Sequence, residues 1–428
     1  MTNTSRVVLA LGLVCAAAGA RTLGAQARTP EPTKDSALVA YDDDGLRIHT
    51  PDRKRQFKVR GYFVLDSRQV LNDTADASTN GFNIRRARVI FDANLFPGVA
   101  MRLMYDVGPI SGPSALQDGY LDVGLGGGWW MRAGKQKTPT SLERYMSISS
   151  QLLPERSIAS NLTPSRDPGV LITGPLAGEH LELAVGVFNG AADGGVTQDN
   201  DPNDDKDITY RLWWKPIKQK VKGAEQGVGF GVWGTRGIEK SPVVTGARLP
   251  AFRTIAQQGW FSFSEAAGAR ANGEHLRNGV FGYVHEGPFG AMAEWYGNSQ
   301  VVTRGATTAT VHTGGWTANA QYSLTGELSN GEGIVPDPAF DVEKGHWGAW
   351  QVGLRASHVS IGSEAFPTFA DSTVSARGAT EVGAAVNWYL TKQTKLQVAY
   401  EHTTFDGGAK AGNRPAERYV QVRWQVYF

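Results

Sequence analysis

The chain is poor in cysteine: its 428 residues include a single one, Cys15. That residue lies within residues 1–27, which have the short apolar core and the small-x-small ending (Ala-Gln-Ala at 25–27) of a cleavable secretory signal peptide. We therefore expect an exported protein whose mature chain starts at Arg28 and lacks cysteine. Such a chain can form no disulfide, no thiolate metal site and no cysteine nucleophile.

Long hydrophobic runs are also missing. Mean hydropathy is -0.29, and beyond the N-terminal stretch no window approaches the roughly 18 to 20 consecutive apolar residues of a membrane-spanning helix. Neither sign of charge dominates, because loss of Arg6 and Arg21 with the signal reduces the 43 basic residues to 41, against 41 acidic ones. The composition excludes a helical membrane protein and gives no reason to expect a nucleic-acid partner.

What the chain does contain is alternation. From residue 57 onward, apolar and polar side chains alternate with a period of two, for example in 57–66 and 396–401, as in strands with two unlike faces. About sixteen such segments of roughly 10 to 15 residues can be marked, and strands this numerous and long are typical of a barrel with lipid outside and water inside. Residues 57–428 are therefore predicted to form an all-β, antiparallel transmembrane barrel in a bacterial outer membrane, and residues 28–56 a periplasmic N-terminal segment.

Connections of two kinds separate these segments. Short turns suit the periplasmic side, and long polar loops suit the outside. Two connections, 217–226 and 326–346, should be periplasmic by parity although neither is short, and Phe252 to Phe263 is interpreted as an ordered piece of loop. The predicted external loops lie near residues 71–80, 138–168, 190–206, 239–274, 302–312, 362–377 and 406–415.

The last segment ends in an aromatic residue. Apolar residues from Val420 to terminal Phe428 alternate with polar ones, and a terminal Phe on such a strand resembles the assembly signal of outer-membrane barrels. We expect Phe428 to serve this role with the barrel assembly machinery. Tryptophan and tyrosine cluster near segment ends, where lipid headgroups favour them.

Several motifs, taken in order, resemble the phosphate-selective porin O/P family over nearly all of 57–428. They are Gly-Phe-Asn-Ile-Arg-Arg-Ala-Arg at 81–88, Leu-Gln-Asp-Gly-Tyr-Leu at 116–121, Arg-Ala-Gly-Lys-Gln-Lys-Thr-Pro at 132–139, Pro-Glu-Arg-Ser at 154–157, Gly-Pro-Phe-Gly at 287–290, Leu-Thr-Gly-Glu at 324–327, Trp-Gly-Ala-Trp at 347–350 and Asn-Trp-Tyr-Leu at 387–390.

This resemblance implies a sixteen-stranded barrel, usually a homotrimer, with loops folded inward to narrow the pore. It implies conduction of small anions, in some members phosphate or polyphosphate. By position, the family's constriction arginines correspond to Arg85 and Arg86, and its central aspartate to Asp118.

Strand parity assigns charges to the lumen, where rings of Arg or Lys can replace the water that an anion loses. The excess of bases over acids there favours anions modestly, although many charges are expected to pair across the lumen. Parity places Arg85 opposite Arg86, toward lipid, unless a bulge intervenes, and Lys135 and Lys137 raise the same difficulty beside Arg132. The lumen bases are Lys58, Arg60, Arg68, Arg86, Arg88, Arg102, Arg132, Arg211, Lys215, Arg277, Arg355, Lys395 and Arg423, and the acids are Asp66, Asp92, Asp106, Asp118, Asp122, Glu182, Glu294, Glu381 and Glu401.

Two loops, 138–168 and 239–274, are expected to constrict the pore. The first carries Arg144, Arg156 and Arg166 together with acids, so its charges serve either the pore or the folding of the loop. The acid-rich stretch 199–207 lacks the glycine and final glutamate of an EF-hand loop, and a solvated external loop is favoured over a divalent-cation site beside lipopolysaccharide.

No enzyme motif and no cofactor or metal site is evident: GxSxG, HExxH and P-loop patterns are absent, and the histidines show no ligand spacing. The sequence thus favours a porin for small anions, possibly phosphate. A general or organic-acid-preferring porin is the alternative, and a plugged barrel with an adhesion or anchoring role is a weaker one.

Overall fold

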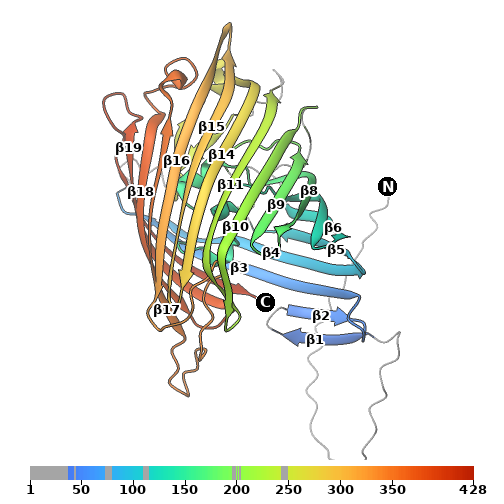
Figure 1. Cartoon of the computed structure of the whole chain (residues 1–428). Helices are drawn as coiled ribbons and strands as arrows, with labels where there is room; N and C mark the ends of the chain where they lie inside the picture. The colour runs from blue at the N-terminus through green and yellow to red at the C-terminus, as the bar shows by residue number, and fades with distance from the viewer. Residues whose placement is uncertain are drawn as a thin grey trace, which may run out of the picture.

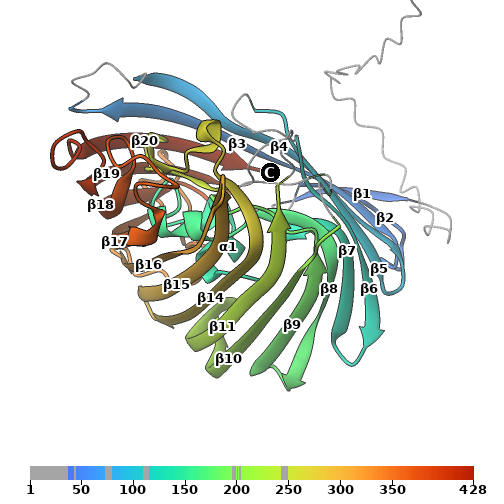
Figure 2. The same cartoon turned by 90° about the horizontal axis from the view of Figure 1, so that it is seen from above.

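A computed structural model describes residues 37–42, 45–72, 80–108, 115–194, 199, 201, 204–241 and 249–428. The expected signal peptide lies outside these residues. Most of the described chain forms one antiparallel barrel of tilted strands (Figures 1 and 2). No helix in the described part is long and apolar enough to cross a membrane.

Sixteen strands pair in chain order, and β20 returns to pair with β3, which closes the barrel as predicted. Lipid offers no partner to an open edge, so closure satisfies every strand. The strands are β3 (Gln56–Val70), β4 (Gly81–Phe96), β5 (Val99–Asp106), β6 (Leu116–Gly126), β7 (Trp129–Lys137), β8 (Arg166–Ala177), β9 (Leu181–Phe188), β10 (Asp207–Val221), β11 (Ala224–Lys240), β14 (Arg270–Glu286), β15 (Phe289–Arg304), β16 (Thr307–Ser323), β17 (Ala349–Ile361), β18 (Ala376–Tyr389), β19 (Thr394–Gly407) and β20 (Glu417–Tyr427).

The two faces of the wall differ as the alternation predicts. On β20, Trp424 is 52% exposed on the outside, whereas its neighbour Arg423 is fully buried inside. The final residue completes the seam, because Phe428 exchanges two backbone hydrogen bonds with Gly61 of β3. A Cβ built at Gly61 would stand only 2.1 Å from Cζ of the Phe428 ring, so the ring fills the space beside this glycine.

Two connections differ from the sequence expectation. At 217–226, β10 and β11 continue to a tight turn at Lys222 and Gly223, both with positive φ, which suits the twist of a hairpin. At 302–312, β15 and β16 continue to a turn at Gly305 instead of forming a long loop. Polar strand ends that rise beyond the lipid resemble loops in composition, so the sequence alone placed these boundaries poorly.

A small hairpin precedes the barrel, formed by β1 (Leu38–Asp42) and β2 (Gly45–His49). β2 pairs with the first residues of β3, beyond the end of β20. The periplasmic position of residues 28–56 stays a prediction.

Loop segments occupy the lumen. The connection from β7 to β8 carries α1 (Leu142–Tyr145), η1 (Ile148–Ser150) and η2 (Ile158–Leu162), and the view from above shows α1 inside the ring of strands (Figure 2). The connection from β11 to β14 carries β12 (Ala251–Arg253), β13 (Gly259–Ser262) and η3 (Glu265–Ala267), and β12 and β13 form a separate two-stranded sheet, in agreement with an ordered piece of loop.

These segments form an apolar plug that fills the lumen beside β14–β18. Its centre holds aromatic residues such as Phe252, Trp260 and Phe261, which pack against Phe369 from the connection between β17 and β18. That connection includes η4 (Ser363–Ala365). Because close-packed apolar side chains admit neither water nor ions, any open path must follow the other wall.

Candidate functional site

The segment 138–165, which folds into the lumen, packs closely against the wall formed by β17 and β18. Leu152 lies over Gly353 of β17, where a Cβ would stand 2.4 Å from its side chain, and Leu153 lies over Gly383 of β18 at 2.7 Å. Glycine thus lets the loop approach the strand backbone closely. The amide of Asn387 donates to the Leu152 carbonyl at 3.0 Å. The wall therefore holds the loop by both packing and hydrogen bonds.

A carboxylate at the loop's centre meets three arginines of the wall. Glu155 accepts from Arg85 at 2.8 Å and pairs with Arg86 at 3.3 Å. Arg423 contacts the same carboxylate and is also paired with Asp66 at 2.7 Å. Burial by itself raises the pKa of Glu155, but the three guanidinium groups outweigh it and hold that pKa well below the usual value.

A β-bulge explains how two consecutive arginines reach one carboxylate. In the β3–β4 ladder, Val64 is opposite Arg86 and Leu65 is opposite Ile84, so Arg85 is the extra residue. A bulge re-aims a side chain that strict alternation would send to the other face. Strict alternation predicted that Arg85 points toward lipid unless a bulge intervenes. That orientation was wrong, because the bulge is present.

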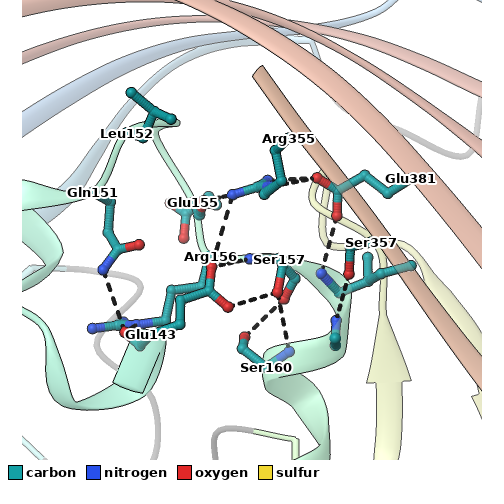
Figure 3. A network of polar contacts seen from close by, with 12 residues as sticks. Glu143, Gln151, Leu152, Glu155, Arg156, Ser157, Ser160, Arg355, Ser357 and Glu381 are labelled. Atoms are coloured by element: carbon teal, nitrogen blue, oxygen red, sulfur yellow. Dashed lines mark hydrogen bonds and ion pairs between the residues drawn. The ribbon is translucent and has the colours of Figure 1, made fainter. Parts of the chain in front are cut away.

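Arg355 is a second anchor. Its guanidinium donates to Glu381 and Glu401 at 2.7 Å each, and to the Glu155 carbonyl at 2.7 Å. Figure 3 shows the same network extending to the start of η2, where the Ser157 amide and hydroxyl donate to the Glu143 carboxylate. The lumen arginines here serve as structural supports for the loop.

The start of the loop rests on a buried carboxylate of β15. Glu294 accepts from the amides of Leu142 and Glu143 at 3.1 and 3.2 Å, and from the Trp233 indole at 2.9 Å. Negative charge is favoured at these free amides of α1. Near the other end, the amides of Ile158 and Ala159 donate to Glu381 and Ser357 at 3.0 and 3.2 Å. Both ends of the segment are thus tied to the wall of β14–β18.

What the loop leaves open is a cavity of about 930 Å³ against β3–β7. Twelve basic and five acidic residues line it, an excess of seven positive charges. The bases are Lys58, Arg60, Arg85, Arg86, Arg88, Arg102, Arg132, Lys137, Arg144, Arg156, Arg166 and Arg253, and the acids are Asp92, Asp106, Asp118, Asp122 and Glu155.

Most cations of the strands are neutralised in pairs. Arg88 pairs with Asp106 at 2.9 Å, Arg132 with Asp122 at 2.6 Å, and Arg166 with Asp118 at 2.6 Å. Asp92 is shared by Arg60 and Arg102. The wall thus carries alternating charges that orient one another. The pairs of Asp92 and Asp122 are partly exposed, whereas those of Asp106 and Asp118 are nearly buried.

Four cations that line the cavity, Lys137, Arg144, Arg156 and Arg253, have no carboxylate at ion-pair distance within the described chain. The first three bond to the segment 138–165. Lys137 donates to the carbonyls of Tyr145 and Met146 at 2.7 and 3.0 Å. Arg156 also donates to the Met146 carbonyl, at 2.9 Å, and Arg144 bonds to Ser160 and Thr163. Burial, and next the Arg144 guanidinium, lower the pKa of Arg156 well below its usual value. This group of cations would be stabilised by a solute anion.

The sequence-selected residues are largely brought together. Ten of them line the cavity: Arg85, Arg86, Arg88, Arg102, Asp118, Arg132, Lys137, Arg144, Arg156 and Arg166. Lys135 does not; it is buried and pairs with Asp199. Lys137, the last residue of β7, lines the cavity although strict alternation from Arg132 would turn it away.

One basic residue was missed. Arg253 lines the cavity from the plug, and no periodic pattern marks a loop residue that reaches the pore only through the fold of its loop. Tyr120 also lies beneath Arg132, whose guanidinium carbon is 3.8 Å from the ring centroid. Aromatic faces of this kind hold an arginine in place without neutralising it.

The acid-rich stretch near residue 200 is only partly described. Asp201 pairs with Lys206, and Asp207 pairs with Arg277 at 2.8 Å. Within the described ranges, no group of three His, Cys, Asp or Glu residues is arranged to hold a metal ion.

Solved structures with a similar fold are outer-membrane proteins. The channel DcaP of Acinetobacter baumannii is 11% identical, with a TM-score of 0.55 over 89% of this chain and 99% of that one. The anion-selective porin of Comamonas acidovorans is 13% identical, with a TM-score of 0.53 over 87% and 100%. OmpT of Vibrio cholerae, in its trimer form, is 11% identical, with a TM-score of 0.53 over 87% and 99%.

Comparison with curated proteins gave no significant match. The family model described as phosphate-selective porin O and P matches residues 57–428, nearly the whole chain and the full extent of the barrel. With the closed barrel and the charged lumen, this match confirms the family and the outer-membrane location expected from the sequence motifs. The chain belongs to the phosphate-selective porin O and P family and is an outer-membrane channel protein.

Proposed function

We propose that the cavity along β3–β7 conducts small anions, phosphate among them, and that Lys137, Arg144 and Arg156 form its constriction. The observation that carries this proposal is the convergence of these cations beside an open cavity without a carboxylate partner in the described chain. An anion entering the cavity must lose part of its hydration shell, and cations and hydrogen-bond donors replace it.

Arg85 and Arg86, which correspond by position to the family's constriction arginines, have a structural role in this proposal. Arg85 and Arg86 are already occupied by Glu155, so they fix the loop and do not offer a free anion site. Arg88, Arg102, Arg132 and Arg166 keep carboxylate partners. These paired arginines line the part of the cavity outside the proposed constriction. Because their charges are compensated, they attract an anion only weakly and allow it to pass.

A homotrimer is also proposed, since OmpT of Vibrio cholerae, a structure of similar fold, is described in a trimer form. Outer-membrane lipid, lipopolysaccharide and the assembly machinery are proposed as further partners, and the exposed apolar outer face and Phe428 support this proposal. The general-porin alternative shares all of these features and differs only in selectivity.

The test is planar-bilayer recording of purified protein in a chloride salt gradient. The sign of the wild-type reversal potential should show a preference for anions, and phosphate should block the chloride current. The double variant Lys137→Gln, Arg156→Gln should shift the reversal potential toward cations and weaken the phosphate block. A plugged barrel would give no conductance at all.

Arg236→Gln is the matched control, because Arg236 lies on the outside with 75% of its side chain exposed and paired to Glu274. It removes one positive charge away from the cavity and should leave selectivity unchanged. An unchanged reversal potential and phosphate block in the double variant would instead favour a general porin.

A further inference from the structure

We propose that the lumen contains a second solute site, on the periplasmic side of the inward segment, which binds small organic anions that carry an aromatic ring. The site rests on the proposed anion channel, which must deliver the solute. It is a cavity of about 810 Å³ whose lining includes the tight turn between β10 and β11 at Gly223. Because that turn lies at the end predicted to be periplasmic, the cavity lies beyond the constriction for an entering solute.

One wall of this cavity is aromatic. Trp213 of β10 and Tyr283 of β14 meet edge to face, with centroids 6.0 Å apart and planes at 90°. Tyr145 of α1 borders the cavity from the loop, and Met146 and Met292 add polarisable surface. Rings and thioethers at this spacing suit the face or edge of a further aromatic ring.

Positive charge lies beside these rings. The Lys215 ammonium is 4.5 Å from the Trp213 ring centroid, and its contact with Glu225 is long, at 3.9 Å. The Arg211 guanidinium also lies near both rings, 5.0 Å from the Trp213 centroid and 4.2 Å from the Tyr145 centroid. Arg60 and Arg88 border the cavity as well, each paired with an aspartate. An aryl carboxylate could therefore place its ring against Trp213 while its carboxylate faces Lys215.

The two cavities adjoin each other along the loop. Arg60, Arg88 and Tyr145 line both of them. Phosphate and chloride have no apolar surface and gain little from the aromatic wall, whereas an aryl carboxylate buries its ring there. The constriction thus selects by charge, and the second site distinguishes among the organic anions that pass it.

The experiment compares block of the chloride current by benzoate and by acetate, which share a carboxylate and differ in the ring. In the wild type, benzoate should block at about five-fold lower concentration, the size of one aromatic contact. In Trp213→Leu, benzoate and acetate should block the chloride current at similar concentrations. Tyr145→Ala, a loop variant that leaves the barrel wall intact, should reduce the same ratio.

Trp214→Leu is the matched control, since Trp214 is the next residue and is 52% exposed on the outer face. It should leave the benzoate-to-acetate ratio unchanged. Equal block by the two anions in the wild type, or a ratio that persists in Trp213→Leu, would overturn the proposal. The reversal potential is recorded in the same experiment, so a channel without anion preference is recognised separately from one without an aromatic site.

Discussion

At the scale of single residues, the central feature is an internal anion at an arginine cluster. Glu155 is held by Arg85, Arg86 and Arg423, so a carboxylate of the loop occupies the arginines that the family resemblance assigns to the constriction. Burying one charge is costly unless partners surround it. The cluster therefore locks the loop, and the proposed solute binding falls to cations that lack such a partner.

Glu155→Gln should destabilise the protein by about 3–5 kcal/mol, because it leaves buried guanidinium groups without their shared carboxylate. The pKa of Glu155 is held far below the unfolded value of about 4.5, so its contribution is complete above that value and is lost as pH falls toward the folded value. Thermal unfolding in detergent should therefore shift strongly on acidification in the wild type and less in the variant. Glu343→Gln, at an exposed site, should behave like the wild type, and an equal acid shift in Glu155→Gln would contradict the assignment.

Asp118 neutralises Arg166 at 2.6 Å, and both line the basic cavity. Asp118→Asn should therefore add one uncompensated positive charge and strengthen phosphate block of the chloride current by about five-fold, the size of one solvent-screened contact between unit charges. Asp341→Asn, which changes an exposed pair in the connection between β16 and β17, serves as the control. Weaker block in Asp118→Asn would indicate that Arg166 turns away once it is released.

At the scale of elements, the alternation along each strand decides which substitutions the barrel tolerates. Val89 lies in the middle of β4 and is 37% exposed on the outside, whereas Asn94 of the same strand lines the basic cavity. Val89→Arg should lower the free energy of unfolding by about 2–4 kcal/mol, the cost of arginine near the bilayer midplane. Asn94→Arg should cost far less, because its charge enters water. Urea unfolding in lipid vesicles measures both, and equal losses would contradict the assignment of faces.

The seam between the first and last strands depends on a small residue facing a large one. Deletion of Phe428, or Gly61→Ala, should lower the amount of heat-modifiable, folded protein in outer membranes, since the ring of Phe428 lies where a Cβ would project. Gly259→Ala is the control, because that Cβ would meet nothing within 4 Å. Normal assembly of the truncated chain would refute the role of the terminal residue.

At the scale of the whole molecule, the lumen is divided between a plug and a channel. The apolar cluster around Phe252 and Phe261 fills the side of β14–β18, and the basic cavity follows β3–β7. The excess of positive charge therefore lies along one wall of the passage, where its field acts on entering ions.

Replacement of residues 241–269 by a short turn should raise single-channel conductance and weaken ion preference, because the plug and Arg253 are removed together. Single-channel recording measures both quantities. Removal of residues 409–412, a loop outside the cavity linings, should change neither. Wild-type conductance in the plug deletion would mean that the narrowest point lies entirely within the segment 138–165.

Much of the fold could be predicted from the residues. The period of two, the strand count and the inward or outward direction of residues such as Arg423 and Trp424 follow from local chemistry, because each strand must match lipid on one face and water on the other. The tight turns at Gly223 and Gly305 were not predicted, since polar strand ends above the membrane have the composition of loops.

The sequence by itself determined the barrel, its family and the set of candidate cations. Only the tertiary structure decided which of these cations are compensated. Arg85 meets Glu155 because a bulge turns it inward, and Arg253 reaches the cavity because the plug folds back. Ion pairing depends on distances of a few ångströms between segments far apart in the chain, and strand periodicity carries no information about those distances.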